Sequence, residues 1–121
     1  MLFHDEFDAE FEAMAVDVQD NLLAAAKAVQ IAGPKTGRPH VDTLNGSKHT
    51  NMKELRFTAH GGRAVWRAAF AFDPERAAVV LVAGEKQGRN QELFYTRLIK
   101  IAGIRFDSHL QQVKAARIVK R

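Results

Sequence analysis

The sequence predicts an α+β fold in which an N-terminal helical hairpin packs on a small antiparallel sheet, with further helix at the C-terminal end. Three observations lead to this expectation. Apolar residues recur at three- and four-residue steps near both ends of the chain, strand-like stretches occupy its middle, and turn-forming residues separate the strands. With 121 residues, of which 46% are hydrophobic, the chain is expected to form a single domain over residues 1–121 without disulfides or a structural metal.

Residues 1–34 are expected to hold the helical hairpin. Phe7 and Phe11 recur at helical spacing in the first helix, and a second apolar stripe follows in "VDVQDNLLAAAKAVQ". Asp17 is the candidate N-cap of the second helix, and the Gly-Pro pair at 33–34 ends that helix.

The middle of the chain is expected to be a sheet. Residues 35–51 show neither a helical nor a strand period, so they are expected to form a long connection. Residues 52–84 hold the strand-like stretches "MKELRF", "VWRAAFAF" and "AAVVLVAG", separated by the turn sequences "TAHGGR" and "DPER". These stretches predict an antiparallel meander. Residues 90–121 return to helical spacing, and the pattern leaves open a break at Gly103.

Strand alternation assigns side chains to the two faces of this sheet. In the second strand, Trp66 and Phe70 lie on one face, and Arg67 lies among alanines on the other. In the preceding strand, Arg56 lies on the face opposite that of Leu55 and Phe57. A meander therefore places Arg56 and Arg67 on the same face of the sheet. The apolar face is expected to pack on the hairpin and to bury Phe7, Phe11, Leu22, Val29, Leu55, Phe57, Trp66 and Phe70.

The charge of the chain is divided unevenly. Residues 1–34 hold seven acidic residues and one basic residue, a balance of −6, whereas residues 35–121 carry +10. Basic charge gathered in one part of a chain favours a polyanionic partner, because each phosphate contact releases condensed counterions. Nucleic acid is therefore the expected partner, and the alternative is a solvated surface of mixed charge.

The composition also excludes some kinds of site. The sequence has no cysteine, which rules out disulfides, a thiol nucleophile and a cysteine-type zinc site, and its five histidines lack the His-x-x-x-His spacing. We therefore expect no metal and no cofactor. No apolar run approaches the ~20 residues that span a bilayer, and the N-terminal stretch is acidic where a signal peptide is basic. The expected location is the cytoplasm, without membrane contact.

The run "GRPHVDTLNGSKHTNMKELRF", followed by "VWRAAFAFDPERAAVVLVAGEKQGRNQELFYTRLIKIA" and "RFDSHL", resembles the phage-derived HigB-like branch of the RelE/ParE superfamily of bacterial type II toxins. The resemblance covers about residues 5–112. It implies a RelE-like fold with two N-terminal helices on a twisted antiparallel sheet. It also implies a metal-independent endoribonuclease that cleaves mRNA on the ribosome and that is neutralised by an antitoxin with a helix-turn-helix domain.

The resemblance implies that Arg67 and Lys86 serve the cleavage site, since basic residues of the family match these positions. The strand pattern adds Arg56, and it leaves the side of Lys86 undetermined. Fixed cations suit this chemistry, because the 2′-hydroxyl attacks the adjacent phosphate and the phosphorane then carries extra negative charge. Further cations are expected to bind the RNA backbone, namely Lys48, Lys53, Arg63 and Arg89.

Other interpretations stay open. Arg67 can instead pair with Glu54 or Glu85 across the sheet. Tyr95 is a candidate base or stacking platform, although its position beside an apolar stripe favours core packing. The candidates for acid and base also include two histidines, whose pKa is better suited to proton transfer, namely His49 and His60.

Two rival functions belong to different classes. The ParE branch of the superfamily poisons DNA gyrase without cutting RNA, and its members lack the cleavage cations. A non-catalytic nucleic-acid-binding module would account for the basic charge and for the tail "KAARIVKR". The sequence therefore favours an mRNA-cleaving toxin with mRNA, the ribosome and an antitoxin as partners.

Overall fold

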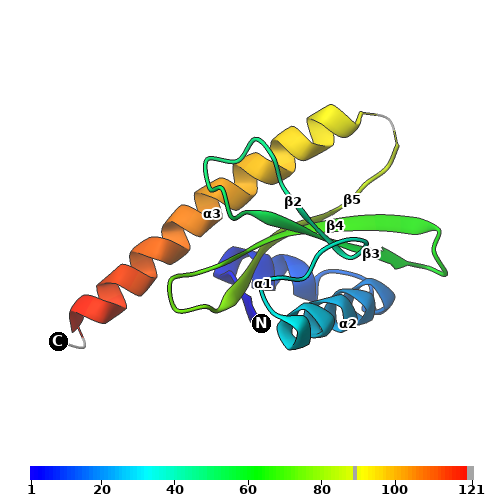
Figure 1. Ribbon diagram of the computed structural model, residues 1–121. Helices are drawn as coiled ribbons and strands as arrows, with labels where there is room; N and C mark the ends of the chain where they lie inside the picture. The colour runs from blue at the N-terminus through cyan, green and yellow to red at the C-terminus, as the bar shows by residue number, and fades with distance from the viewer. Residues whose placement is uncertain (89, 120–121) are drawn as a thin grey trace.

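The computed structural model describes residues 1–88 and 90–119, which form two layers of helix around one sheet (Figure 1). The elements in chain order are β1 (Leu2–Phe3), α1 (Asp5–Glu12), α2 (Val16–Ala32), β2 (Val41–Thr43), β3 (Lys53–Ala59), β4 (Ala64–Phe72), β5 (Ala78–Glu85) and α3 (Gln91–Val119). The five strands lie in the order β1-β5-β4-β3-β2. Helices α1 and α2 cover one face of the sheet and α3 crosses the other face (Figure 1). The α+β fold predicted from the sequence is confirmed.

The layer between the sheet and the N-terminal helices is the larger hydrophobic core. Helix α1 packs against β5 and α2 against β3. Trp66 is half-buried and stacks on Phe57, with 6.0 Å between the ring centroids. The predicted core is confirmed, since all its members belong to this cluster, as fully buried residues or, for Phe11 and Trp66, as partly buried ones.

The predicted N-cap of the second helix is wrong. Helix α2 is capped by Ala15, without a side-chain hydrogen bond. Asp17 lies inside the first turn instead, where a carboxylate still favours the helix dipole. Its carboxylate accepts a hydrogen bond from the backbone N–H of His60, so it ties α2 to the β3–β4 turn.

The sheet is mixed, which corrects the prediction of a purely antiparallel one. The meander of β3, β4 and β5 is antiparallel as predicted, but β1 pairs with β5 in parallel. Residues 35–51 also contain β2, which pairs antiparallel with β3. Strands of two and three residues are too short to show a period in the sequence, so only their pairing partners reveal them.

Helix α3 is one continuous helix, so the C-terminal helices and the break considered at Gly103 are wrong. Glycine weakens a helix by about 1 kcal/mol relative to alanine. Buried residues on both sides of Gly103 offset this cost, because Leu98, Ala102 and Phe106 pack in the second hydrophobic cluster, between α3 and the sheet. Residues 120–121 of the predicted helical region lie outside the described residues.

A β-bulge in β5 decides which face Lys86 occupies. The register with β4 shifts between Ala69 and Phe70, so that Leu81 and Val82 both join the cluster under α3. Beyond the bulge the alternation of β5 is reversed. Lys86 therefore lies on the α3 face, and its Nζ is 5.4 Å from the centroid of the Tyr95 ring.

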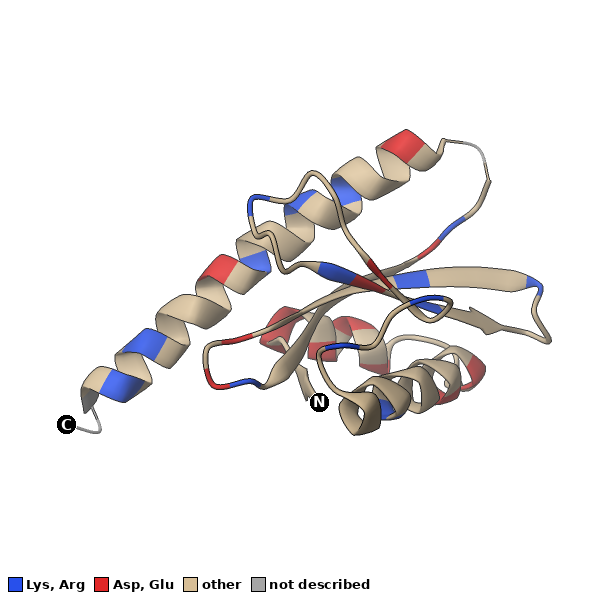
Figure 2. Ribbon diagram, in the orientation of Figure 1, with Lys and Arg blue, Asp and Glu red and all other residues tan. Residues whose placement is uncertain are grey.

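Acidic and basic residues are concentrated on different parts of the fold. Acidic residues lie along α1 and at the N-terminal end of α2, whereas lysine and arginine predominate on the strands, the loops and α3 (Figure 2). The protein therefore has an acidic helical side and a basic side. Within residues 1–88 and 90–119, no helix combines the length and apolar character needed to cross a bilayer.

Candidate active site

Two arginines face one another on the side of the sheet that α3 covers. Arg56 on β3 and Arg67 on β4 are cross-strand partners in the antiparallel register. The Arg67 side chain is 12% exposed and that of Arg56 is 31% exposed. Arg67 donates a hydrogen bond from Nη1 to the backbone oxygen of Trp66, at 2.9 Å. The shared face predicted from strand alternation is therefore what the structure shows.

Glu54 is the anion of this arginine pair. Its side chain is only 4% exposed, and its Oε1 lies 2.9 Å from Nη2 and 3.0 Å from Nε of Arg56. Its Oε2 lies 4.0 Å from Nε of Arg67, which is an ion-pair contact but too long for a hydrogen bond. The hydrogen bond to Glu54 raises the pKa of Arg56, so Arg56 stays charged.

Of the two carboxylates considered as partners of Arg67, Glu54 is the one beside it. Glu85 lies opposite Trp66 in the β4–β5 register, so it belongs to the other face. Among the described residues, Oε2 of Glu54 and Nε of Arg67 are both buried without a hydrogen-bond partner. The cluster thus contains an acceptor and a donor that the protein itself leaves unsatisfied.

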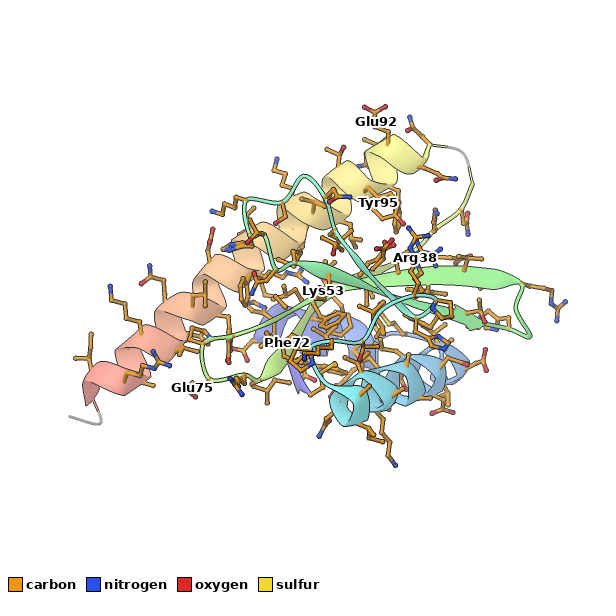
Figure 3. All side chains as sticks on the ribbon, in the orientation of Figure 1. Arg38, Lys53, Phe72, Glu75, Glu92 and Tyr95 are labelled. Atoms are coloured by element: carbon orange, nitrogen blue, oxygen red, sulfur yellow. The ribbon has the colours of Figure 1, made fainter. Side chains whose placement is uncertain are left out.

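Tyr95 and Lys86 extend the cluster toward α3. Tyr95 lies near the start of α3 and reaches toward the sheet (Figure 3). Burial raises the pKa of Tyr95, and the neighbouring Glu54 raises it further against the opposing effect of Arg67. Tyr95 is therefore a neutral phenol at physiological pH, which can donate a hydrogen bond. Its ring also packs against Phe94 and the cluster under α3, in agreement with the core packing that the sequence favours for Tyr95.

Further charged residues lie between Arg56 and the edge strand β2. Asp42 on β2 lies 3.6 Å from Nη2 of Arg56 and accepts a hydrogen bond from Nη2 of Arg38 at 2.7 Å. Arg38 is exposed and lies on the loop before β2 (Figure 3). Arg56 and Arg67 also border a groove of about 430 Å³ between β3, residues 39–40 and α2. The arginines can thus be reached from this groove.

The four predicted RNA-binding residues do not gather at this cluster. Lys48 pairs with Asp107 on α3, in the connection between β2 and β3. Lys53 begins β3 in register with Phe70, so it points to the face of α1 and α2. Arg63 lies in the β3–β4 turn and donates to the backbone oxygen of His60. Arg89 lies outside the described residues.

Neither predicted histidine joins the cluster. Nε2 of His49 lies 2.9 Å from Oδ1 of Asp107, and its ring packs edge-on against Phe106. His60 lies in the β3–β4 turn, where Nδ1 is 3.4 Å from Asp17. Each histidine therefore has a structural partner of its own.

Sequence reasoning missed the central position of Glu54, which it treated only as one of two structural partners for Arg67. The signal was present, because Glu54 has the same strand parity as Arg56 and directly faces Ala69. An acid placed between two arginines on a face lined with alanines is expected to balance their charge. Its position beside Tyr95 depends on α3, which the strand pattern does not place.

The cluster can bind and stabilise an anion. The cations of Arg56, Arg67 and Lys86 outnumber the single buried carboxylate. Guanidinium groups offer paired N–H donors to phosphate oxygens. Among residues 1–88 and 90–119, no group of three His, Asp or Glu side chains is placed to share a metal ion.

Comparison with known proteins gives the family. Residues 9–107 match the family described as Phage derived protein Gp49-like (DUF891). The chain belongs to this family. This Gp49-like chain is 43% identical over 100 residues to the protein named "Putative toxin HigB2" of Mycobacterium tuberculosis (strain ATCC 25618 / H37Rv), a match covering 83% of this chain and 49% of that one. It is 39% identical over 100 residues to "Putative toxin HigB3" of the same strain, and the match covers 83% of each chain.

The resemblance to the HigB-like branch is confirmed by these relatives. The matching part of the Gp49-like chain spans about half the length of the first relative. The family match runs from α1 into α3 and includes every residue of the cluster around Glu54. No solved structure is significantly similar to the Gp49-like chain.

Proposed function

We propose that this protein is the toxin of a type II toxin–antitoxin system and that it is a metal-independent endoribonuclease. The observation that carries the proposal is that Arg56, Arg67 and Tyr95 lie around the buried Glu54, with Lys86 over the ring of Tyr95. The names of the two relatives support a toxin. The cation cluster supports a phosphate substrate, and the basic side of the protein supports a nucleic acid.

The reaction is the transfer of a phosphodiester within RNA. The ribose 2′-oxygen loses its proton and attacks the adjacent phosphorus, the bond from phosphorus to the 5′-oxygen breaks, and a proton reaches that leaving oxygen. The products are a 2′,3′-cyclic phosphate and a 5′-hydroxyl. A protein can accelerate this step by aligning the attack and by stabilising the charge of the phosphorane.

Each residue of the cluster has a role in this proposal. Arg67 and Lys86 stabilise the phosphorane, and Arg56 draws the phosphate toward the strands. Tyr95 donates a hydrogen bond as a neutral phenol. Glu54 is a positioning residue, because its carboxylate holds Arg56 by a hydrogen bond and an ion pair and faces Arg67. The terminal nitrogens of Arg67, rather than its buried Nε, would then donate to a phosphate oxygen.

The proposed partners are mRNA, the ribosome and a cognate antitoxin with a helix-turn-helix domain. An unrestrained ribonuclease would stop the growth of its host, so a dedicated inhibitor is required. The acidic side formed by α1 and α2 and the basic side offer such an inhibitor two differently charged surfaces (Figure 2). Cells producing the wild-type protein alone should stop growing, and co-production of the antitoxin should restore growth.

A translation extract with a reporter mRNA, assayed beside DNA gyrase, tests the proposal against its rivals. Fragments of the mRNA indicate a nuclease. Gyrase-dependent DNA breaks indicate a ParE-like poison and would overturn the proposal. RNA binding without either product indicates a non-catalytic module, in which Arg67 serves only as the partner of Glu54. Addition of a chelator at constant ribosome integrity should leave the cleavage rate unchanged.

A further inference from the structure

A second groove lies beside the proposed site, between α3 and the connection from β2 to β3. Its volume is about 350 Å³, and its lining residues are Ser47, Lys48, Ile99, Lys100, Gly103 and Ile104. Ile99 follows Tyr95 by one helical turn, about 6 Å along the axis of α3. Figure 1 shows the β2–β3 connection running alongside the middle of α3. The groove therefore begins next to the residues proposed to cleave RNA.

Both walls of the groove are held in place. Asp107 of α3 contacts His49 at 2.9 Å and pairs with Lys48, so the connection is fastened to the helix. Leu44 and Met52, at the two ends of the connection, are buried in the cluster under α3. The groove is thus formed before any ligand arrives, which lowers the entropic cost of binding.

Gly103 in this groove has no structural explanation in the described residues. Glycine weakens a helix, and it is needed where φ is positive or where packing leaves no room for a Cβ atom. Gly103 is not among the described residues with positive φ. A Cβ atom on Gly103 would have no heavy atom within 4 Å outside its own turn of helix. The described residues therefore leave open space beside Gly103.

We propose that this groove binds a nucleobase of single-stranded RNA next to the cleaved phosphate, an inference that rests on the proposed function. Ile99, Gly103 and Ile104 would contact the face of the base, and Lys48 and Lys100 would contact the flanking phosphates. The flat face of a base can pack against aliphatic side chains by burying apolar surface, and lysines beside it can contact the backbone.

The chemistry of the groove favours a nucleotide over a protein segment. Ile104 is 60% exposed at the rim, so apolar surface faces solvent there. Lys100 is exposed and has no ion pair within the described residues. Lys48, which is 65% exposed and pairs with Asp107, stands on the opposite wall. An apolar floor between cations matches a ligand with a flat apolar face and a regular row of anions, which is the structure of a nucleotide strand.

Substitution of Gly103 tests the proposal through binding rather than cleavage. The probe is a fluorescent 2′-O-methyl RNA oligonucleotide of mixed sequence, which lacks the nucleophilic hydroxyl, and its affinity is measured by anisotropy. Gly103→Leu should weaken binding about tenfold, a change of about 1.4 kcal/mol, because the leucine side chain would occupy the space of the base. Ala116→Leu, at an exposed position of the same helix outside the groove, should bind as the wild type does.

Two further variants keep the test independent of misfolding. Gly103→Ala should raise the melting temperature, because the helix gains a better residue and its Cβ meets no clash, yet it should still weaken RNA binding. Lys100→Ala should lower the salt dependence of binding by about 0.7 in log–log slope, the value for one phosphate contact on a single strand. Lys27→Ala, on the exposed side of α2, should leave that slope unchanged.

The outcomes separate this inference from the proposed function. If the wild type binds no RNA probe, this inference fails, while the ribonuclease proposal is decided by the mRNA fragments in the translation extract. If the wild type binds but Gly103→Leu binds as tightly as Ala116→Leu, the nucleobase site is wrong while the ribonuclease proposal survives. If Gly103→Leu no longer binds the antitoxin but keeps full affinity for RNA, the groove is a binding site for the antitoxin and the inference is overturned.

Discussion

Arg56 on β3 and Arg67 on β4 are direct cross-strand partners, and the carboxylate of Glu54 lies within 4.0 Å of both. Like charges directly opposite one another destabilise a sheet, so this arrangement depends on the anion between them. Glu54→Gln removes the charge and keeps the size. We expect the free energy of unfolding to fall by about 2 to 4 kcal/mol, because the largely buried Arg67 loses its counter-charge and the partly exposed Arg56 keeps only Asp42 beside it.

The measurement is urea denaturation of the Glu54→Gln variant beside Glu85→Gln as the matched control. Glu85 is an exposed carboxylate near the end of β5, so its loss should change stability by no more than about 0.5 kcal/mol. Equal effects of the two substitutions would show that Glu54 does not hold the arginines together.

Tyr95→Phe should separate packing from chemistry. The ring stays in the cluster under α3, so stability should fall by no more than about 1 kcal/mol, the net value of one hydrogen bond. Cleavage should slow by at least about tenfold, because a donor to the reacting phosphate is lost. Since burial raises the pKa of Tyr95, this phenol stays protonated up to pH values above its ordinary ~10.

The pH dependence of this variant checks the role assigned to Tyr95. Below pH 10 the wild type and Tyr95→Phe should show rate profiles of the same shape, displaced by a constant factor. A basic limb near neutral pH that is present only in the wild type would mean that Tyr95 loses its proton during catalysis, against the raised pKa.

Asp73 should make stability depend on pH in the acid range. It is buried in the β4–β5 turn, where it accepts hydrogen bonds from the N–H groups of Glu75 and Ala77 and contacts Nε2 of His109 at 2.8 Å. Burial alone raises the pKa of Asp73, but the His109 contact and the two N–H groups outweigh it and lower the pKa below its usual value.

A lowered folded-state pKa stabilises the protein above the unfolded value of about 3.9, and this contribution disappears as the pH falls through the folded value. Asp73→Asn should therefore be less stable than the wild type at pH 7, and the difference should shrink below about pH 4. Denaturation at pH 7 and pH 3 measures it. A difference of the same size at both pH values would exclude ionised Asp73 as the source of stability.

The features that depend on strand alternation were predictable from the sequence. Because side chains alternate along a strand, Arg67 was predicted on the face opposite Trp66. The same rule placed Arg56 on the face of Arg67. The apolar stripes likewise identified the layer that contains Phe7 and Phe70. These patterns are local and repeat over many residues, so tertiary contacts were not needed to interpret them.

The remaining features depend on contacts that the sequence does not encode locally. The bulge at Leu81 and Val82 lies in a continuous apolar run, so nothing in the residue types marks the reversal that brings Lys86 under α3. The histidines were predicted from their intrinsic pKa, but Asp107 and Asp17 are brought to His49 and His60 only by folding. Glu54 was undervalued for the same reason, since Tyr95 of α3 is brought beside it only by folding.

The most direct test of the central claim is the rate of RNA cleavage, and the chemistry of the new ends, for the wild type and two Arg67 variants. The account predicts a 2′,3′-cyclic phosphate on the 5′ fragment. It predicts a rate lower by about 10²- to 10³-fold in Arg67→Ala, with the fold intact, because one preorganised donor to the phosphorane is lost. Arg67→Lys should recover only part of the rate, since a point charge cannot contact two phosphate oxygens as guanidinium does. Full activity of a folded Arg67→Ala variant would contradict the account and leave Arg67 as a structural partner of Glu54.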